Sequence, residues 1–119
     1  MTGYRRGAVV LVPFPFTDLS AVKRRPALIV SNDTYNDATG DVIIAQITSK
    51  VHSPARPGDH RLEDWRGAGL PLPSLVRARM TTLHGSLLIR SLGTMPDGEM
   101  RAIDERLAET LGLSRRQPD

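Results

Sequence analysis

The residues best suited to chemistry are three adjacent cations, Lys23, Arg24 and Arg25, which precede Pro26 and the apolar run 27–30. The guanidinium of arginine is permanently charged and presents a planar fork of donors that matches the oxygens of a phosphate group. Charged residues also flank hydrophobic strands simply because they oppose aggregation. The cluster therefore indicates either a phosphate-binding site or a protected strand end.

A second polar group stands at the end of another apolar segment. The sequence QITSK at 46–50 closes with Thr48, Ser49 and Lys50. Their two hydroxyls and one ammonium are groups that bind phosphoryl oxygens in nucleic-acid complexes. Strand ends are also polar without any ligand, because they emerge into water. We therefore treat these three residues as candidates for binding the same phosphate chain.

A third pattern lies in VRARM at 76–80, where apolar and basic residues alternate. A period of two places Arg77 and Arg79 on one face of a strand, as a stripe suited to a nucleic-acid backbone. A half-exposed strand without a ligand produces the same alternation. Both interpretations stay open at this stage.

The sequence lacks the residues or spacings that several other classes of site need. The chain has no cysteine, which excludes disulfides, thiolate nucleophiles and zinc sites built on cysteine. Its histidines, His52, His60 and His84, have none of the spacings typical of metal ligands, and His52 and His60, in the probable loop, are expected to be solvated side chains. No acidic cluster suits two-metal chemistry, and no glycine-rich phosphate loop occurs. We therefore expect no metal and no cofactor.

Charge and hydropathy indicate the class of partner. Residues 1–30 carry Arg5, Arg6 and the cluster at 23–25 against the single acid Asp18, although the net charge of the chain is only +3. This distribution suits a polyanion. The two Phe, two Tyr and one Trp argue against a base-stacking platform. No apolar run approaches the roughly 20 residues that span a bilayer, so we expect a cytoplasmic protein without membrane contact.

The elements that position these residues are mostly strands. Residues rich in β-branched side chains predict strands over 7–16, 25–32, 41–50, 74–83 and 88–95. Segment 41–50 is apolar nearly throughout and should be central. Segment 32–41 is dense in turn-forming residues. The long connection 51–74, in which only HRLED is strand-like, is expected to be functional or mobile.

The C-terminal segment has a different period. Apolar residues fall at helical spacing, at Met100, Ile103, Leu107 and Leu111. Thr94 is the expected N-cap, with Asp97 three residues later, and Gly112 is the expected end. Short strands followed by one helix predict a single domain over 1–119, of α+β class, built as a small β-barrel with a C-terminal α-helix.

Four segments together resemble the MazF/PemK family of toxins. They are RRGAVVLVPFPFTDLSAVKRRPALIVSNDTYN, VIIAQITSK, LPSLVRARMTTL and MPDGEMRAIDERLAETLGL, and they cover nearly the whole chain in order. The most specific parts are RRPALIVS and ITSK. The resemblance implies an SH3-like β-barrel, a homodimer, and the toxin half of a toxin–antitoxin pair. It also implies metal-independent cleavage of single-stranded RNA at short sequences, which leaves 2′,3′-cyclic phosphate and 5′-hydroxyl ends, and an acidic antitoxin as partner.

The resemblance also assigns roles. The family's catalytic arginine precedes the proline, which here is Arg25, and its partner threonine is Thr48. Because an arginine with a pKa above about 12 is a poor general base, we assign Arg25 to transition-state stabilisation and to proton delivery to the leaving oxygen. The base is unassigned. Lys23 and Arg24 would steer and neutralise the flanking phosphates.

Two positions depart from the family pattern. Relatives usually carry an acidic residue at the position of Ala8, and often a polar or acidic one where Ala78 and Arg79 stand. The second departure implies that a different RNA sequence is read. The first leaves an alternative open, namely a non-catalytic toxin on the same barrel that binds nucleic acid or a protein such as gyrase. A barrel without any ligand would leave the cation cluster unexplained.

Overall fold

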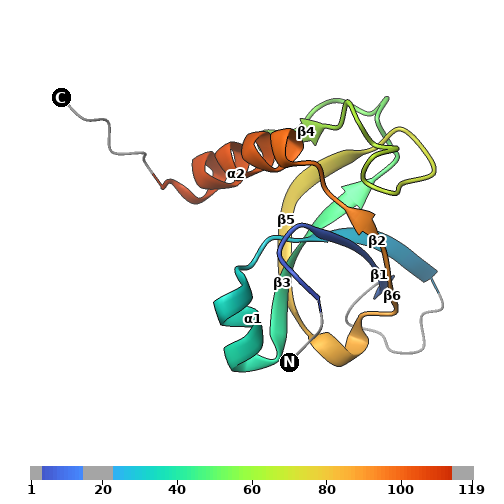
Figure 1. The fold of residues 1–119 in the computed structure, drawn as a ribbon. Coiled ribbons are helices and arrows are strands. Elements are labelled where there is room, and N and C mark those ends of the chain that lie inside the picture. Colours follow the sequence, from blue (N-terminus) through green and yellow to red (C-terminus); the bar gives the residue numbers. More distant parts are fainter. Residues whose placement is uncertain (1–3, 15–22, 114–119) are drawn as a thin grey trace.

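The computed structural model describes residues 4–14 and 23–113 of the 119-residue chain. Within these residues a six-stranded antiparallel sheet has the order β4-β5-β3-β2-β1-β6. The strands are β1 (Ala8–Phe14), β2 (Lys23–Ile29), β3 (Asp41–Thr48), β4 (His60–Arg61), β5 (Leu75–His84) and β6 (Arg90–Thr94). The sheet curls into a half-barrel, and helix α2 (Asp97–Leu111) lies across one end of it (Figure 1). The predicted α+β class is confirmed, and β3 is central as expected.

Strand β2 begins earlier than predicted, and this changes the setting of the basic cluster. Lys23 pairs with Phe14 of β1 and Arg25 pairs with Val12, so Lys23 and Arg24 lie within the strand together with Arg25. Pairing of β2 with β3 starts only at Ala27. The preceding residue, Pro26, has no N–H to donate to a neighbouring strand. The cationic half of β2 therefore extends beyond its ladder with β3.

A proline, Pro13, lies near the far end of β1. Pairing of β1 with β6 ends at Leu11, so Pro13 lies beyond that ladder. A proline is tolerated there because the strand needs no donor on that side. Pro15 and Phe16, the last residues of the predicted strand 7–16, lie outside the described residues.

The prediction of a turn over 32–41 is wrong, because the segment forms helix α1 (Asp33–Thr39). The Asn32 side chain accepts a hydrogen bond from the backbone N–H of Tyr35 at 2.7 Å. Gly40 ends the helix in the left-handed region at φ 74°, which glycine adopts without steric cost. The same residue types that favour turns supply both caps of this short helix.

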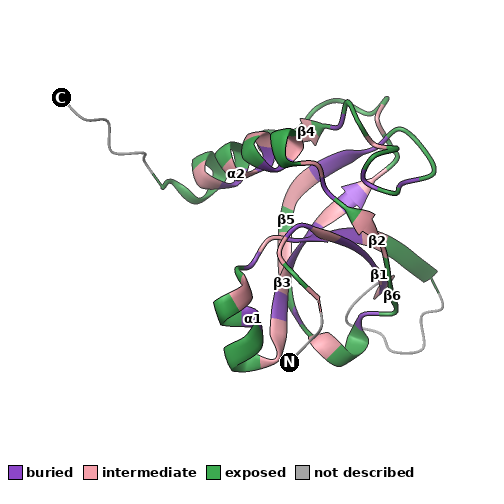
Figure 2. Ribbon diagram, in the orientation of Figure 1, coloured by how far each residue is buried: buried purple, intermediate pink, exposed green. Residues whose placement is uncertain are grey.

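Apolar side chains pack on both faces of the sheet. Val9, Leu28 and Ile47 lie in a cluster with the buried face of α2. Val10, Val12, Ala27, Ile29, Val42 and Ile44 fill the inside of the curl with Leu83 and Leu88. Figure 2 shows buried residues along the strands of the curled sheet and exposed residues at the start of β2. The alternation along β1 and β2 is what assigns neighbouring residues to opposite clusters.

Helix α2 differs from its prediction at both ends. Met100, Ile103 and Leu107 are buried as expected, whereas Leu111 is 57% exposed because the helix extends past the sheet. The predicted N-cap is wrong, since Thr94 ends β6 and the cap residue is Pro96, with no side-chain cap hydrogen bond. Gly112 ends the helix as predicted, with φ 73°. Among the described residues, no helix combines the length and apolarity needed to cross a bilayer.

The connection between β3 and β5 is packed against α2 and contains β4. Oε2 of Glu99 accepts from the backbone N–H groups of Glu63 at 2.8 Å and Asp64 at 2.9 Å, and His60 donates to Oε1 at 2.9 Å. Burial acts to raise the pKa of Glu99, but the hydrogen bonds from His60 and the two N–H groups outweigh it and hold the pKa below its usual value. One carboxylate thus joins the first turn of α2 to this connection.

Candidate functional site

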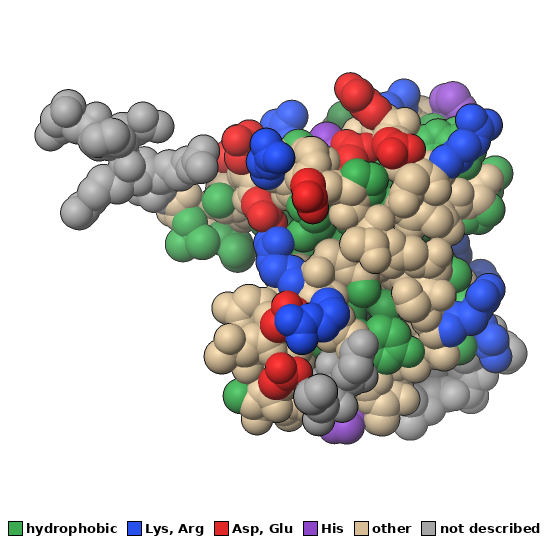
Figure 3. Space-filling model, viewed as in Figure 1, with side chains coloured by type: hydrophobic (Ala, Val, Ile, Leu, Met, Phe, Trp, Pro, Cys, Tyr) green, Lys and Arg blue, Asp and Glu red, His purple; other side chains and the backbone are tan. Residues whose placement is uncertain are grey.

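Arg25 lies where the cationic half of β2 meets its buried half. Residues 23–25 are exposed, whereas Ala27 to Ile29 are buried. The Arg25 guanidinium carbon stands 5.6 Å from the centre of the Phe14 ring in the paired strand, a cation–π distance that orients the side chain. Figure 3 shows Lys and Arg side chains at the right margin of the molecule, beside the start of β2.

Two adjoining hollows meet at Arg25 and Pro26. The larger hollow has a volume of about 360 Å³, and the smaller hollow has a volume of about 120 Å³. Besides the two shared residues, the larger is lined by Val12, Phe14, Ala27, Ile44, Gln46, Arg79, Met80 and Thr81. The smaller is lined by Ile47, Thr48, Ser49, Leu70, Pro71, Leu72 and Ser74. Arg25 is therefore placed to contact a ligand in either hollow.

The smaller hollow brings together the two residues to which the resemblance assigns catalysis. Arg25 and Thr48 both line it, although they lie 23 positions apart on different strands. In the register of β2 and β3, Ala27 lies opposite Gln46. Continuing this register by two residues places Arg25 beside Thr48. Thr48 Oγ1 accepts a hydrogen bond from the N–H of Lys50 at 3.2 Å. Because this bond uses a lone pair, the hydroxyl hydrogen can be donated to a ligand.

The other predicted phosphate-binding residues surround the hollows. Ser49 lines the smaller hollow, and Lys50 follows it on the exposed chain after β3. Lys23 and Arg24 are exposed on β2 and line neither hollow. Their positions suit contacts to parts of a chain that extend away from Arg25.

Arg77 and Arg79 do not form the single stripe that a period of two would give. The register of β3 and β5 shifts so that Ala45 faces Met80 and Gln46 faces Arg77, which leaves two extra residues on β5. This bulge interrupts the period-two alternation that the prediction needs. Arg79 is exposed and lines the larger hollow, whereas Arg77 lines neither.

Arg77 is instead paired with an acid of the long connection. Its Nε and Nη2 donate to the two carboxylate oxygens of Asp59 at 3.1 and 3.2 Å. The side chains are 14% and 6% exposed. Burial acts to raise the pKa of Asp59, but hydrogen bonds from Arg77 and from the Arg56 N–H outweigh it and lower the pKa. This geometry gives Arg77 a structural role.

Gln46 and Phe14 were not among the predicted site residues. Gln46 lines the larger hollow, and its Oε1 atom is buried without a hydrogen-bond partner among the described residues. Phe14 was counted only as one of few aromatic residues, yet it contacts Arg25. The sequence signal that could have pointed to Gln46 is a polar amide within the otherwise apolar stretch IIAQI.

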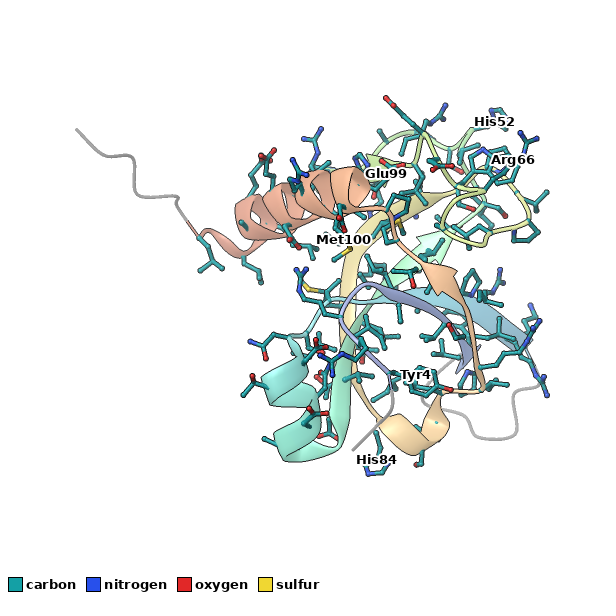
Figure 4. The ribbon with its side chains drawn as sticks, viewed as in Figure 1. Tyr4, His52, Arg66, His84, Glu99 and Met100 are labelled. Carbon is teal, nitrogen blue, oxygen red and sulfur yellow. The ribbon has the colours of Figure 1, made fainter. Side chains whose placement is uncertain are left out.

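The histidines lie apart from the two hollows, and the expectation that His60 is solvated is wrong, because its side chain is only 16% exposed. His60 forms a hydrogen bond with Glu99. His84 Nδ1 lies 2.7 Å from Ser86 Oγ, at the start of a 3₁₀ turn, Gly85–Leu87. His52 and His84 stand at opposite ends of the molecule in Figure 4. None of the three lines either hollow. Within residues 4–14 and 23–113, no three potential metal ligands of the types His, Cys, Asp and Glu gather.

Known proteins share this sequence and fold. The sequence model of a family described as PemK-like, MazF-like toxin of type II toxin–antitoxin system matches residues 5–111. Endoribonuclease MazF2 of Mycobacterium bovis is 34% identical over 93 residues, which cover 76% of this chain and 81% of that protein.

Two solved mycobacterial structures are also similar. An endoribonuclease in complex with its cognate antitoxin superposes with a TM-score of 0.77 at 28% identity, over 96% of this chain and 100% of that one. A second endoribonuclease gives a TM-score of 0.75 at 30% identity, over 98% of each chain. The resemblance implied an SH3-like β-barrel, and these two proteins share the curled six-stranded sheet and C-terminal helix of this chain. Because the family model matches most of this chain, the chain belongs to the PemK-like, MazF-like toxins of type II toxin–antitoxin systems.

Proposed function

We propose that this toxin is a metal-independent endoribonuclease that cleaves single-stranded mRNA at short sequences, with Arg25 and Thr48 as its catalytic residues. The observation that carries the proposal is the smaller hollow, where a guanidinium and a hydroxyl from neighbouring strands converge. The names of the similar mycobacterial endoribonucleases support RNA as substrate.

The reaction we propose is an internal transesterification. The ribose 2′-oxygen attacks the adjacent phosphorus and loses its proton, while the bond from phosphorus to the 5′-oxygen breaks and that oxygen gains a proton. The products are a 2′,3′-cyclic phosphate and a 5′-hydroxyl. Negative charge builds on the non-bridging oxygens of the five-coordinate phosphorus, where fixed donors stabilise the transition state most.

Arg25 provides two parallel N–H donors for those oxygens, and its orientation is preset by the Phe14 ring. Thr48 donates its hydroxyl hydrogen to the same phosphate. Pro26 restricts the backbone that carries Arg25. A permanently charged guanidinium is an ineffective base, so Arg25 acts on the developing charge and on the leaving 5′-oxygen.

The flanking phosphates are bound by exposed cations. Lys23, Arg24 and Lys50 extend along the chain on either side of Arg25, Ser49 adds a hydroxyl, and Arg79 lies at the larger hollow. Each cation that neutralises a phosphate releases a counterion and steepens the salt dependence of binding. Arg77 is left out of this set because it is paired with Asp59.

The partners we propose follow from the same surface. A cognate antitoxin with an acidic, partly disordered segment would cover the cations by mimicking the RNA backbone. We propose a homodimer, a single domain over 1–119, and a cytoplasmic location, where mRNA is found. One of the similar solved structures is an endoribonuclease in complex with its cognate antitoxin.

The departure at Ala8 does not favour a non-catalytic toxin. Ala8 begins β1, pairs with Thr94 and packs beside the cluster inside the curl. It lines neither hollow, so the missing acid removes no group from their walls.

The test is cleavage of a mixed-sequence single-stranded RNA by the purified chain in excess EDTA, with mapping of both new ends. We expect specific cuts that end in cyclic phosphate. Intact RNA that is nevertheless bound would refute the proposal and support a binding function. Loss of cleavage that Mg²⁺ restores would refute metal independence.

A further inference from the structure

Gln46, whose side-chain oxygen has no hydrogen-bond partner among the described residues, lines the larger hollow. Gln46 Oε1 is buried, and among the described residues it is the buried side-chain oxygen or nitrogen that lacks a hydrogen bond. Buried polar atoms in folded proteins nearly always have partners, so each exception needs an explanation. Gln46 lines the larger hollow, and a bound ligand that donates to this oxygen would supply one.

The rest of the hollow suits a flat, mostly apolar ring. Most of its lining residues are apolar, namely Val12, Phe14, Pro26, Ala27, Ile44 and Met80. Its polar groups are few and converge from three strands, from Arg25, Gln46, Arg79 and Thr81. The volume of about 360 Å³ lies within the range of small-ligand sites, roughly 300–1,000 Å³. A nucleobase has this combination of apolar faces and a polar edge, and single-stranded RNA can turn its bases outward into such pockets.

The position of the hollow relates it to the phosphate site. Arg25 and Pro26 line both hollows, so a phosphate held by Arg25 stands at their junction. A base in the larger hollow then belongs to a nucleotide that flanks the phosphate bound by Arg25. Arg79, beside the same hollow, can contact that nucleotide's backbone or base.

We propose that the larger hollow is a nucleobase subsite and that Gln46 determines which base it accepts. The proposal rests on the proposed function and adds the specificity of the same site. Because the unpartnered atom is an acceptor, the base must bring a donor, and an exocyclic amino group beside a ring-nitrogen acceptor fits the amide best. On their Watson–Crick edges adenine and cytosine carry that pair of groups, whereas the amino group of guanine adjoins an N–H donor there and uracil has no amino group. Paired hydrogen bonds from glutamine to adenine are a common readout.

The experiment compares cleavage of RNA randomised at each nucleotide next to the cut by the wild-type chain and by Gln46→Ala. The wild type should require adenine or cytosine at one of these positions. The variant should lose that preference by about 5- to 150-fold, the range for one paired contact to a base. Thr82→Ala is the matched control, since Thr82 is exposed on β5 next to Thr81 but does not line the hollow.

A second arm changes the RNA instead of the protein. Replacing the preferred adenosine by purine riboside, which lacks the amino group, should slow the wild type and leave Gln46→Ala unchanged relative to its own rate on adenosine. For cytosine the matching analogue lacks the 4-amino group. If Gln46→Ala does not cleave, binding of RNA with one 2′-deoxynucleotide at the cut reports the same preference without chemistry.

The outcomes separate the two proposals. Absence of cleavage by the wild-type chain refutes the proposed function. Cleavage with the same base preference in wild type and Gln46→Ala, or no slowing with the analogue, overturns the role of Gln46 and leaves the function standing. A wild-type preference for guanine or uracil at every flanking position overturns the amino-group readout.

Discussion

Replacing Arg77 should affect stability and not RNA binding, which is the opposite of what its place in the sequence suggests. The variant Arg77→Ala removes both hydrogen bonds to Asp59, at 3.1 and 3.2 Å. It leaves a carboxylate whose side chain is 6% exposed without its cationic partner. Breaking one half of a buried ion pair costs about 3–5 kcal/mol. Asp59 still accepts a hydrogen bond from the N–H of Arg56 at 2.9 Å. We therefore expect a loss of stability at the lower end of this range, about 3 kcal/mol.

The assay is urea unfolding of Arg77→Ala, with Arg79→Ala as the matched control. Arg79 is exposed, so its replacement should change the free energy of unfolding by less than about 0.5 kcal/mol. For a domain of this size, 3 kcal/mol corresponds to a fall in Tm of roughly 10 °C or more. RNA binding at a temperature where both variants are folded should be weakened by Arg79→Ala and unchanged by Arg77→Ala.

The pH dependence gives a further check on the same pair. Hydrogen bonds from Arg77 and Arg56 hold the pKa of Asp59 below 3.8 against the opposing effect of burial. Its contribution to stability is therefore complete above the unfolded-state pKa and is lost as the pH falls through the folded value. Arg77→Ala should consequently lose less stability between pH 5 and acid than the wild type does. Unchanged stability together with a shallower salt dependence of RNA binding would refute the structural role of Arg77.

The remaining predictions concern the site and α2. Arg25→Ala should lower turnover on the order of 10²–10³-fold or more, the scale for losing a key oxyanion donor, and Thr48→Ala should lower it less; near-normal single-turnover cleavage by the Arg25 variant would remove it from catalysis. Arg24→Ala should weaken binding to all RNA sequences alike and reduce the salt slope by about one, so an unchanged slope would contradict the phosphate contact. Glu99→Gln should cost about 1–2 kcal/mol at neutral pH; because the bonds to His60 and two N–H groups lower the Glu99 pKa, this difference should shrink as the pH falls below about 4 in acid-unfolding curves.

Much of the fold could be predicted because its signals are local. Strands such as Asp41–Thr48 are runs of β-branched residues whose character does not depend on distant contacts. The three buried residues of α2 follow from helical spacing, and Gly112 marks its end. The error at α1 has the same local origin, because capping residues and turn residues are the same types. The exposure of Leu111 was unpredictable locally, since it depends on where the sheet ends beneath the helix.

The same distinction between local signals and distant contacts applies to the candidate site. By itself the sequence determined which groups were available for phosphate chemistry, Arg25 beside a proline and Thr48 at a strand end, because residue type and a short motif carry that information. Only the tertiary structure decided which groups meet. The register of β2 and β3 brings Arg25 and Thr48 to one hollow, while a two-residue bulge in β5 separates Arg79 from Arg77. Strand register and bulges are set by pairing between distant segments, and a single segment of sequence does not contain them.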